Sequence, residues 1–139
     1  MAVATAPTTE MCGNDLYRGY DGQITEQPTW MVMDAVRLAG VTPTERGFRI
    51  APHLPFAPFS LRLPRVGVAT SARAIRGYVV TEADGPVELE VHVPTASGLV
   101  HAWAGTHAVP HKLGGGSVVF QVTAHTGAPA DWAVTWTGD

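Results

Sequence analysis

Short runs of β-branched and aromatic residues, separated by turn residues, fill the chain from residue 59 almost to its end. The runs cover residues 59–63, 66–69, 74–81, 87–93, 99–104, 106–109, 117–124 and 132–136. No helical pattern falls between any two of them, whereas parallel strands need crossover connections that are usually helices. The sequence therefore predicts a mostly β fold, an antiparallel β-sandwich or jelly roll of about eight strands.

Alternation of apolar and polar residues is clearest at positions 87–93, where Val and Leu occupy the odd positions. Glu88, Glu90 and His92 occupy the even positions. Because successive side chains of a strand point to opposite faces, this strand is predicted to bury one face and leave the other in solvent. The strongest turn signals are the glycines at 85 and at 114–116, since glycine readily adopts the positive φ of tight hairpins.

One helix is predicted before the strands, over residues 28–39, with Pro28 in its first turn and Gly40 as its stop signal. Its apolar residues, from Trp30 to Ala39, surround nearly the whole helix and leave only a narrow polar stripe. A small sandwich covers one face of such a helix. We therefore expect further protein, either another chain, which includes a second copy of this one, or a missing domain, to cover the rest.

A connector with four prolines follows the helix over residues 40–58. Proline lacks an N–H group and has a fixed φ, which argues against both a helix and a central strand. The predicted organisation is a flexible lead-in and loop (1–27), the helix and the stiff, extended connector (28–58), and the sandwich domain (59–139).

Composition limits the partners of this 139-residue chain, whose length suits one domain. The net charge is −3 with only nine Lys and Arg, which argues against nucleic acid as a partner. No apolar run approaches the length of about 18 residues that a membrane span needs. Cys12 is the single cysteine, and the first nine residues lack the pattern of a secretory signal, so we expect a cytoplasmic location.

Metal and hydrolase signatures are weak. The six histidines lack the close spacing of zinc ligands, so we expect strand histidines and neither a metal nor a cofactor.

A different group of residues lies around the loop that leads into the helix: Tyr17, Tyr20, Asp21, Glu26 and Trp30. Aromatic rings stack on sugars and carboxylates bind hydroxyl groups or move protons, so these residues are candidates for a sugar site, with Glu26 as a weak catalytic candidate. The alternative is that the rings pack the helix and the acids cap it.

Three segments carry a resemblance to a known family: AGVTP at 39–43, RGFRIAP at 46–52 and ELEVHVP at 88–94. With the apolar helix before them, they resemble the C-terminal end of the six-hairpin glycosidases, nearest to the α-L-rhamnosidase-like enzymes of bacteria. The resemblance implies the last barrel helix, a connector and the β-sandwich. It also implies that most of the helical barrel, which carries the general acid, is missing from this chain.

Three functions remain open at this stage. The resemblance implies a C-terminal domain or subunit of a glycoside hydrolase, inactive alone, that contacts sugar or mediates assembly. A free-standing carbohydrate-binding module is the first alternative and would expose aromatic rings on one sheet face. A β-sandwich that only mediates protein assembly is the second.

Overall fold

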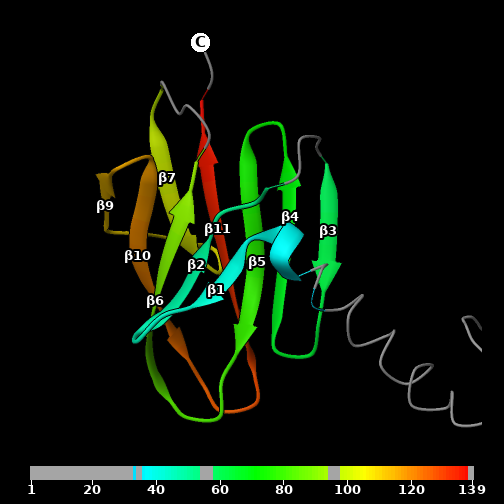
Figure 1. The fold of residues 1–139 in the computed structure, drawn as a ribbon. Coiled ribbons are helices and arrows are strands. Elements are labelled where there is room, and N and C mark those ends of the chain that lie inside the picture. The colour runs from blue at the N-terminus through cyan, green and yellow to red at the C-terminus, as the bar shows by residue number, and fades with distance from the viewer. Residues whose placement is uncertain (1–32, 34–35, 54–57, 94–97, 138–139) are drawn as a thin grey trace, which may run out of the picture. The chain divides into compact units, whose positions relative to one another are not determined.

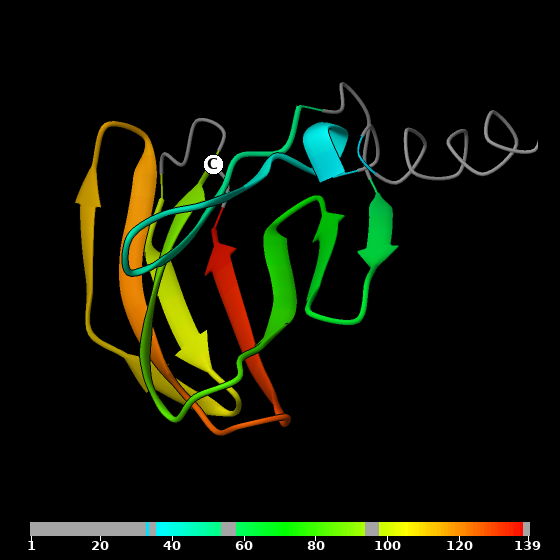
Figure 2. The same ribbon diagram turned by 60° about the horizontal axis from the view of Figure 1, so that its bottom comes forward.

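The computed structural model describes residues 33, 36–53, 58–93 and 98–137, and the chain divides into two units between residues 35 and 36. All described strands belong to the second unit, where they form two facing sheets (Figures 1 and 2). The predicted β-sandwich is confirmed.

Sheet A has five strands and sheet B has six. In spatial order, sheet A contains β1 (Val41–Pro43), β2 (Gly47–Ile50), β6 (Gly85–His92), β10 (Ser117–Ala124) and β9 (His111–Gly114). Sheet B contains β3 (Phe59–Arg62), β4 (Val66–Ser71), β5 (Ala74–Val80), β11 (Pro129–Trp136), β7 (Val100–Ala104) and β8 (His107–Val109). Each of the eight predicted runs overlaps one of these strands, while β1, β2 and β9 were not predicted.

The connector differs most from its sequence-based prediction, because it supplies β1 and β2. Strand β2 lies inside sheet A, between β1 and β6, and pairs with β6 in parallel. The prolines of the connector do not interrupt the pairing of β2 with β6, since Pro43 ends the edge strand β1 and Pro52 follows β2. Strands β3 to β5 of the other sheet separate β2 from β6 in sequence, so a parallel pair forms here without a crossover helix.

The core lies between the sheets and confirms the alternation predicted for residues 87–93. Val87, Leu89, Val91 and Val93 are buried, whereas His92 is exposed. Glu88 and Glu90 are half-buried on the outer face, where β2 and β10 flank them. The Arg49 Nε lies 3.2 Å from a Glu90 carboxylate oxygen, so part of this outer face is occupied by an ion pair.

The described end of the predicted helix covers residues 36–39 and stops at Gly40, which has a φ of +71°. A Cβ atom at Gly40 would lie 1.8 Å from the Ala51 carbonyl oxygen, so both the turn and the close approach require glycine. Ala39 and Val36 pack against the core, and both views place the helical turn beside β4 (Figures 1 and 2). The predicted C-terminal stop is confirmed.

The hairpin predicted at glycines 114–116 is confirmed, whereas Gly85 begins β6 with a φ of +142° and forms no hairpin, because β5 and β6 belong to different sheets. Gly115 and Gly116, with φ values of +60° and +79°, join β9 to β10. Asp84 precedes β6 and also joins two loops, since one carboxylate oxygen accepts hydrogen bonds of 2.8 Å from the N–H and hydroxyl of Thr126. These bonds favour the ionised carboxylate and lower the pKa of Asp84.

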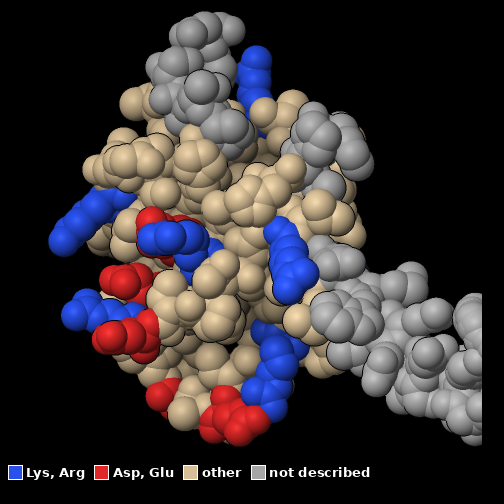
Figure 3. All heavy atoms as spheres, viewed as in Figure 1, with Lys and Arg blue, Asp and Glu red and all other residues tan. Residues whose placement is uncertain are grey.

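Charged side chains are unevenly distributed on the face seen in Figure 3. Groups of both signs gather over the lower part of this face, around the β1–β2 hairpin, and the upper part is mostly uncharged. Arg65 and Glu82 form another ion pair, which lowers the pKa of Glu82. Mixed surface charges of this kind give no single-sign surface on this side of the sandwich.

Candidate functional site

The sugar-site residues proposed from the sequence lie outside the described part of the chain. This applies to Tyr17, Tyr20, Asp21, Glu26 and Trp30 alike. Their grouping and the catalytic candidacy of Glu26 therefore stay predictions.

The histidines, in contrast, are all described. Five are exposed, and only His111 is half-buried, with its Nδ1 atom 3.4 Å from the Val109 carbonyl oxygen. Within residues 33, 36–53, 58–93 and 98–137, no group of three or more His, Cys, Asp or Glu side chains could hold a metal ion.

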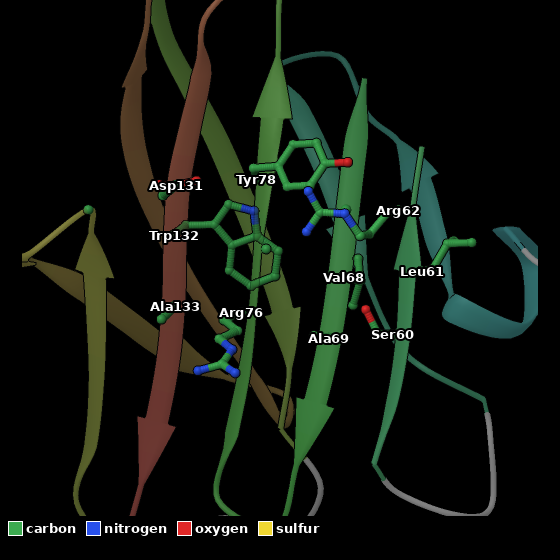
Figure 4. A pocket seen from close by; sticks show the side chains of 13 residues that line it. Ser60, Leu61, Arg62, Val68, Ala69, Arg76, Tyr78, Asp131, Trp132 and Ala133 are labelled. Carbon is green, nitrogen blue, oxygen red and sulfur yellow. The ribbon is translucent and has the colours of Figure 1, made fainter. Parts of the chain in front are cut away.

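A hollow of about 340 Å³ lies on the outer face of sheet B (Figure 4). The strand register explains why it forms. Small residues flank the middle strand, since Ala69 on β4 and Ala133 on β11 both pair with Arg76 of β5. Longer side chains, Arg62, Arg76 and Tyr78, stand on the same face around them. The hollow is thus a low area of small residues bounded by polar and aromatic side chains.

Two glycines that line the hollow lie against aromatic rings. A Cβ atom at Gly67 would lie 2.1 Å from Cε1 of Tyr78, so the Tyr78 ring occupies the space over β4 on the outer side. A Cβ atom at Gly77 would lie 2.8 Å from Cζ2 of Trp132. The indole of Trp132 therefore fills the space beside β5 on the core side.

The Tyr78 side chain is held by one contact to its hydroxyl group and one to its ring. Its hydroxyl group donates a 2.6 Å hydrogen bond to the Leu63 carbonyl, just beyond β3. The Arg62 guanidinium lies 5.6 Å from the ring centroid, a cation–π distance, and Figure 4 shows Arg62 reaching from β3 toward Tyr78. Asp131, which also lines the hollow, is the cross-strand partner of Tyr78 on β11.

Aromatic surface continues beyond Ala133 onto β7. Trp103 pairs with Ala133, so it shares the outer face, and it is half-buried there. Its indole N–H donates a 3.2 Å hydrogen bond to the Thr135 hydroxyl, and the His101 ring centroid lies 6.4 Å from its own. The ring of Trp103 is therefore fixed in place beside the hollow.

The other two tryptophans of the sandwich point into the core. Trp132 is 2% exposed, and Trp136, on the same side of β11, is half-buried and packs against the core. Within the described residues, the buried Nε1 of Trp132 has no hydrogen-bond partner.

The sequence interpretation did not identify Arg62, Arg76, Tyr78 or Asp131 as a group. These residues lie on three strands that are far apart in sequence. A local signal existed, because alternation along β5 puts Arg76 and Tyr78 on one face. Only the pairing of β3, β4, β5 and β11 shows that they surround one hollow.

A second, smaller hollow of about 280 Å³ lies at one end of the sandwich. Val93, Val100 and Leu113 line it, and Leu113 is 64% exposed. The described residues that line it are mostly apolar or glycine, and none of them is charged. It offers a contact surface but no recognisable chemistry.

The described fold defines this protein as a β-sandwich with a polar and aromatic hollow on one outer sheet face. No protein-family model and no curated protein matches the chain. No helix within the described residues is long and apolar enough to span a membrane.

Proposed function

We propose that this chain is a sugar-contacting β-sandwich of a carbohydrate-active enzyme, and that the outer face of sheet B is its binding surface. The observation that carries this proposal is the hollow of about 340 Å³ with Tyr78, Arg62, Arg76 and Asp131 around it. Sugar sites combine aromatic surface for the apolar faces of the ring with donors and acceptors for the hydroxyl groups.

The dimensions of the face suit a chain of several sugars better than a single small ligand. The hollow is lined by residues of β3, β4, β5 and β11, and neighbouring strands are about 4.8 Å apart, which gives a width of about 14 Å. Trp103 on β7 adds aromatic surface one strand further on. A short oligosaccharide lying across the strands would contact both ends of this face.

Binding is a better account of this face than hydrolysis. A glycoside hydrolase needs two carboxyl groups about 5 to 10 Å apart. Asp131 is the one carboxylate that lines the hollow among the described residues. Catalysis in this proposal belongs to another part of the enzyme, in line with the resemblance to the six-hairpin glycosidases, and Glu26 stays a weak candidate for a residue near that site.

The free-standing binding module is the nearest alternative and uses the same face. An exposed apolar side chain favours an attached enzyme domain over an isolated module, because Leu38 is 47% exposed. Exposed apolar side chains of this size are common at contacts with other proteins. The partner in this proposal is a helical-barrel catalytic chain or a second copy of the chain.

Glycan-affinity electrophoresis and calorimetry with the purified chain test this proposal. We expect one or more members of a panel of plant and bacterial polysaccharides to retard the chain. Trp103→Ala should weaken that binding by about tenfold, since aromatic contacts contribute about 0.5 to 1.5 kcal/mol beyond their buried area.

Arg49→Gln is the matched control, because Arg49 is an exposed arginine on sheet A. It should leave glycan binding unchanged. Binding that is lost in Arg49→Gln and kept in Trp103→Ala would show that the site is on sheet A and not on sheet B. The absence of binding to any glycan would refute the proposal.

A further inference from the structure

We infer that the glycan bound at the outer face of sheet B is acidic, with carboxylate groups that Arg62 and Arg76 bind. This inference rests on the proposed function and specifies its substrate class. It is carried by the charges that the strand register places around one hollow.

The two arginines come from β3 and β5 and flank the small residues of β4. Arg62 and Arg76 both line the hollow and are both exposed. The strands that carry them are two positions apart in the sheet, so their backbones lie about 10 Å apart. Side chains as long as arginine can reach one ligand from both sides of this gap.

Neither arginine forms an ion pair with a described carboxylate. The ion pairs of the described surface include Arg49 with Glu90 and Arg65 with Glu82, and both lie away from the hollow. Arg62 contacts the Tyr78 ring, which orients its guanidinium without neutralising it. The positive charges are therefore available to an anionic ligand.

Asp131 makes the charge of the face uneven. It stands on β11, about 14 Å from the strand β3 that carries Arg62, whereas Arg76 is on β5, the strand beside β11. A carboxylate of the sugar would be attracted most strongly on the side of Arg62 and repelled near Asp131. Neutral hydroxyl groups suit the Asp131 side, where a carboxylate accepts their hydrogen bonds.

Arginine is well suited to this role because its planar guanidinium binds a carboxylate through two parallel hydrogen bonds. A neutral sugar uses these donors less well. Hydrogen bonds to charged groups contribute more than neutral ones, by an amount that corresponds to about a ten- to hundredfold gain in affinity.

The test compares tetragalacturonic acid with its fully methyl-esterified form, two probes that differ in charge and keep the same sugar ring. We expect isothermal titration calorimetry to show at least about tenfold tighter binding of the acid, with an affinity that falls as salt rises. Arg76→Gln should weaken binding of the acid more than binding of the ester and so reduce this preference. Arg76→Lys, which keeps the charge without the planar fork, should give an intermediate preference.

Each outcome bears on the inference separately from the proposed function. Equal binding of the acid and the ester would overturn the inference and leave the sugar-binding proposal standing. Equal binding of poly-L-glutamate would also overturn it, because recognition would then depend on charge without sugar. Binding of neither probe, nor of any glycan in the larger panel, would refute both.

Salt dependence keeps the test decisive if Arg76→Gln does not fold. A preference of the wild-type chain for tetragalacturonic acid that persisted unchanged from low to high salt would contradict an arginine–carboxylate contact on an exposed face.

Discussion

Replacement of Leu89 by alanine is the sharpest test of the core. Leu89 is 0% exposed and lies on β6, opposite Phe48 of β2 and Phe120 of β10. Buried Leu→Ala changes cost about 2 to 5 kcal/mol, and the cost rises with the size of the cavity that remains. Because β6 is hydrogen-bonded to a strand on each side, its backbone cannot move to fill the cavity. We therefore expect a loss of about 3 to 5 kcal/mol.

Glu90 provides the matched control on the same strand. Its side chain is 32% exposed and its partner Arg49 is 57% exposed, so their ion pair is largely accessible to water. Exposed ion pairs contribute about 0 to 1 kcal/mol, and we expect Glu90→Ala to cost no more than about 1 kcal/mol. The two neighbouring substitutions should thus differ by at least about 2 kcal/mol.

Urea unfolding followed by tryptophan fluorescence measures both losses. The dependence of the unfolding free energy on urea should stay the same in the two variants, so that a shift of the midpoint reports stability. Equal or reversed costs would refute the register of β6. A shift of one residue would exchange the buried and outer faces of the whole strand.

Three further predictions concern backbone fit, acid stability and association. Gly77→Ala should lower the free energy of unfolding in urea by more than about 2 kcal/mol, since its Cβ would lie 1.9 Å from the Gly67 carbonyl oxygen. Gly114→Ala is the control, because a Cβ there meets nothing within 4 Å, and it should change the free energy of unfolding by no more than about 0.5 kcal/mol. Hydrogen bonds from Thr126 lower the pKa of Asp84 in the folded state. The stability that these hydrogen bonds add is therefore present above the ordinary pKa of about 3.9, and it is lost as the pH falls through the lowered pKa of the folded state. Asp84→Asn should therefore show a smaller loss of stability than the wild type in acid unfolding titrations, and an identical pH profile would contradict this. Light scattering should show a dimer or larger species that Leu38→Glu converts to a monomer, because Leu38 is half exposed, and a wild-type monomer at high concentration would exclude self-association.

Local patterns in the sequence were sufficient for much of the sandwich. Alternation at residues 87–93 predicted which side of β6 is buried, because side-chain direction in a strand depends only on the neighbouring positions. The glycines at 40, 115 and 116 likewise marked a helix end and a tight turn, since positive φ is a property of a single residue. The prolines of the connector were a weaker guide, because proline excludes a ladder hydrogen bond only at its own position.

Pairing between distant strands was decided by the tertiary structure alone. The sequence contains no local signal that β2 inserts beside β6 in parallel, since the benefit of that pairing depends on burial of Phe48 and Ile50 against the finished core. The hollow on sheet B has the same origin. Arg62, Arg76, Tyr78 and Asp131 become neighbours only when β3, β4, β5 and β11 align, so the sequence determined which residues face outward along each strand, and the strand register determined that they face one another.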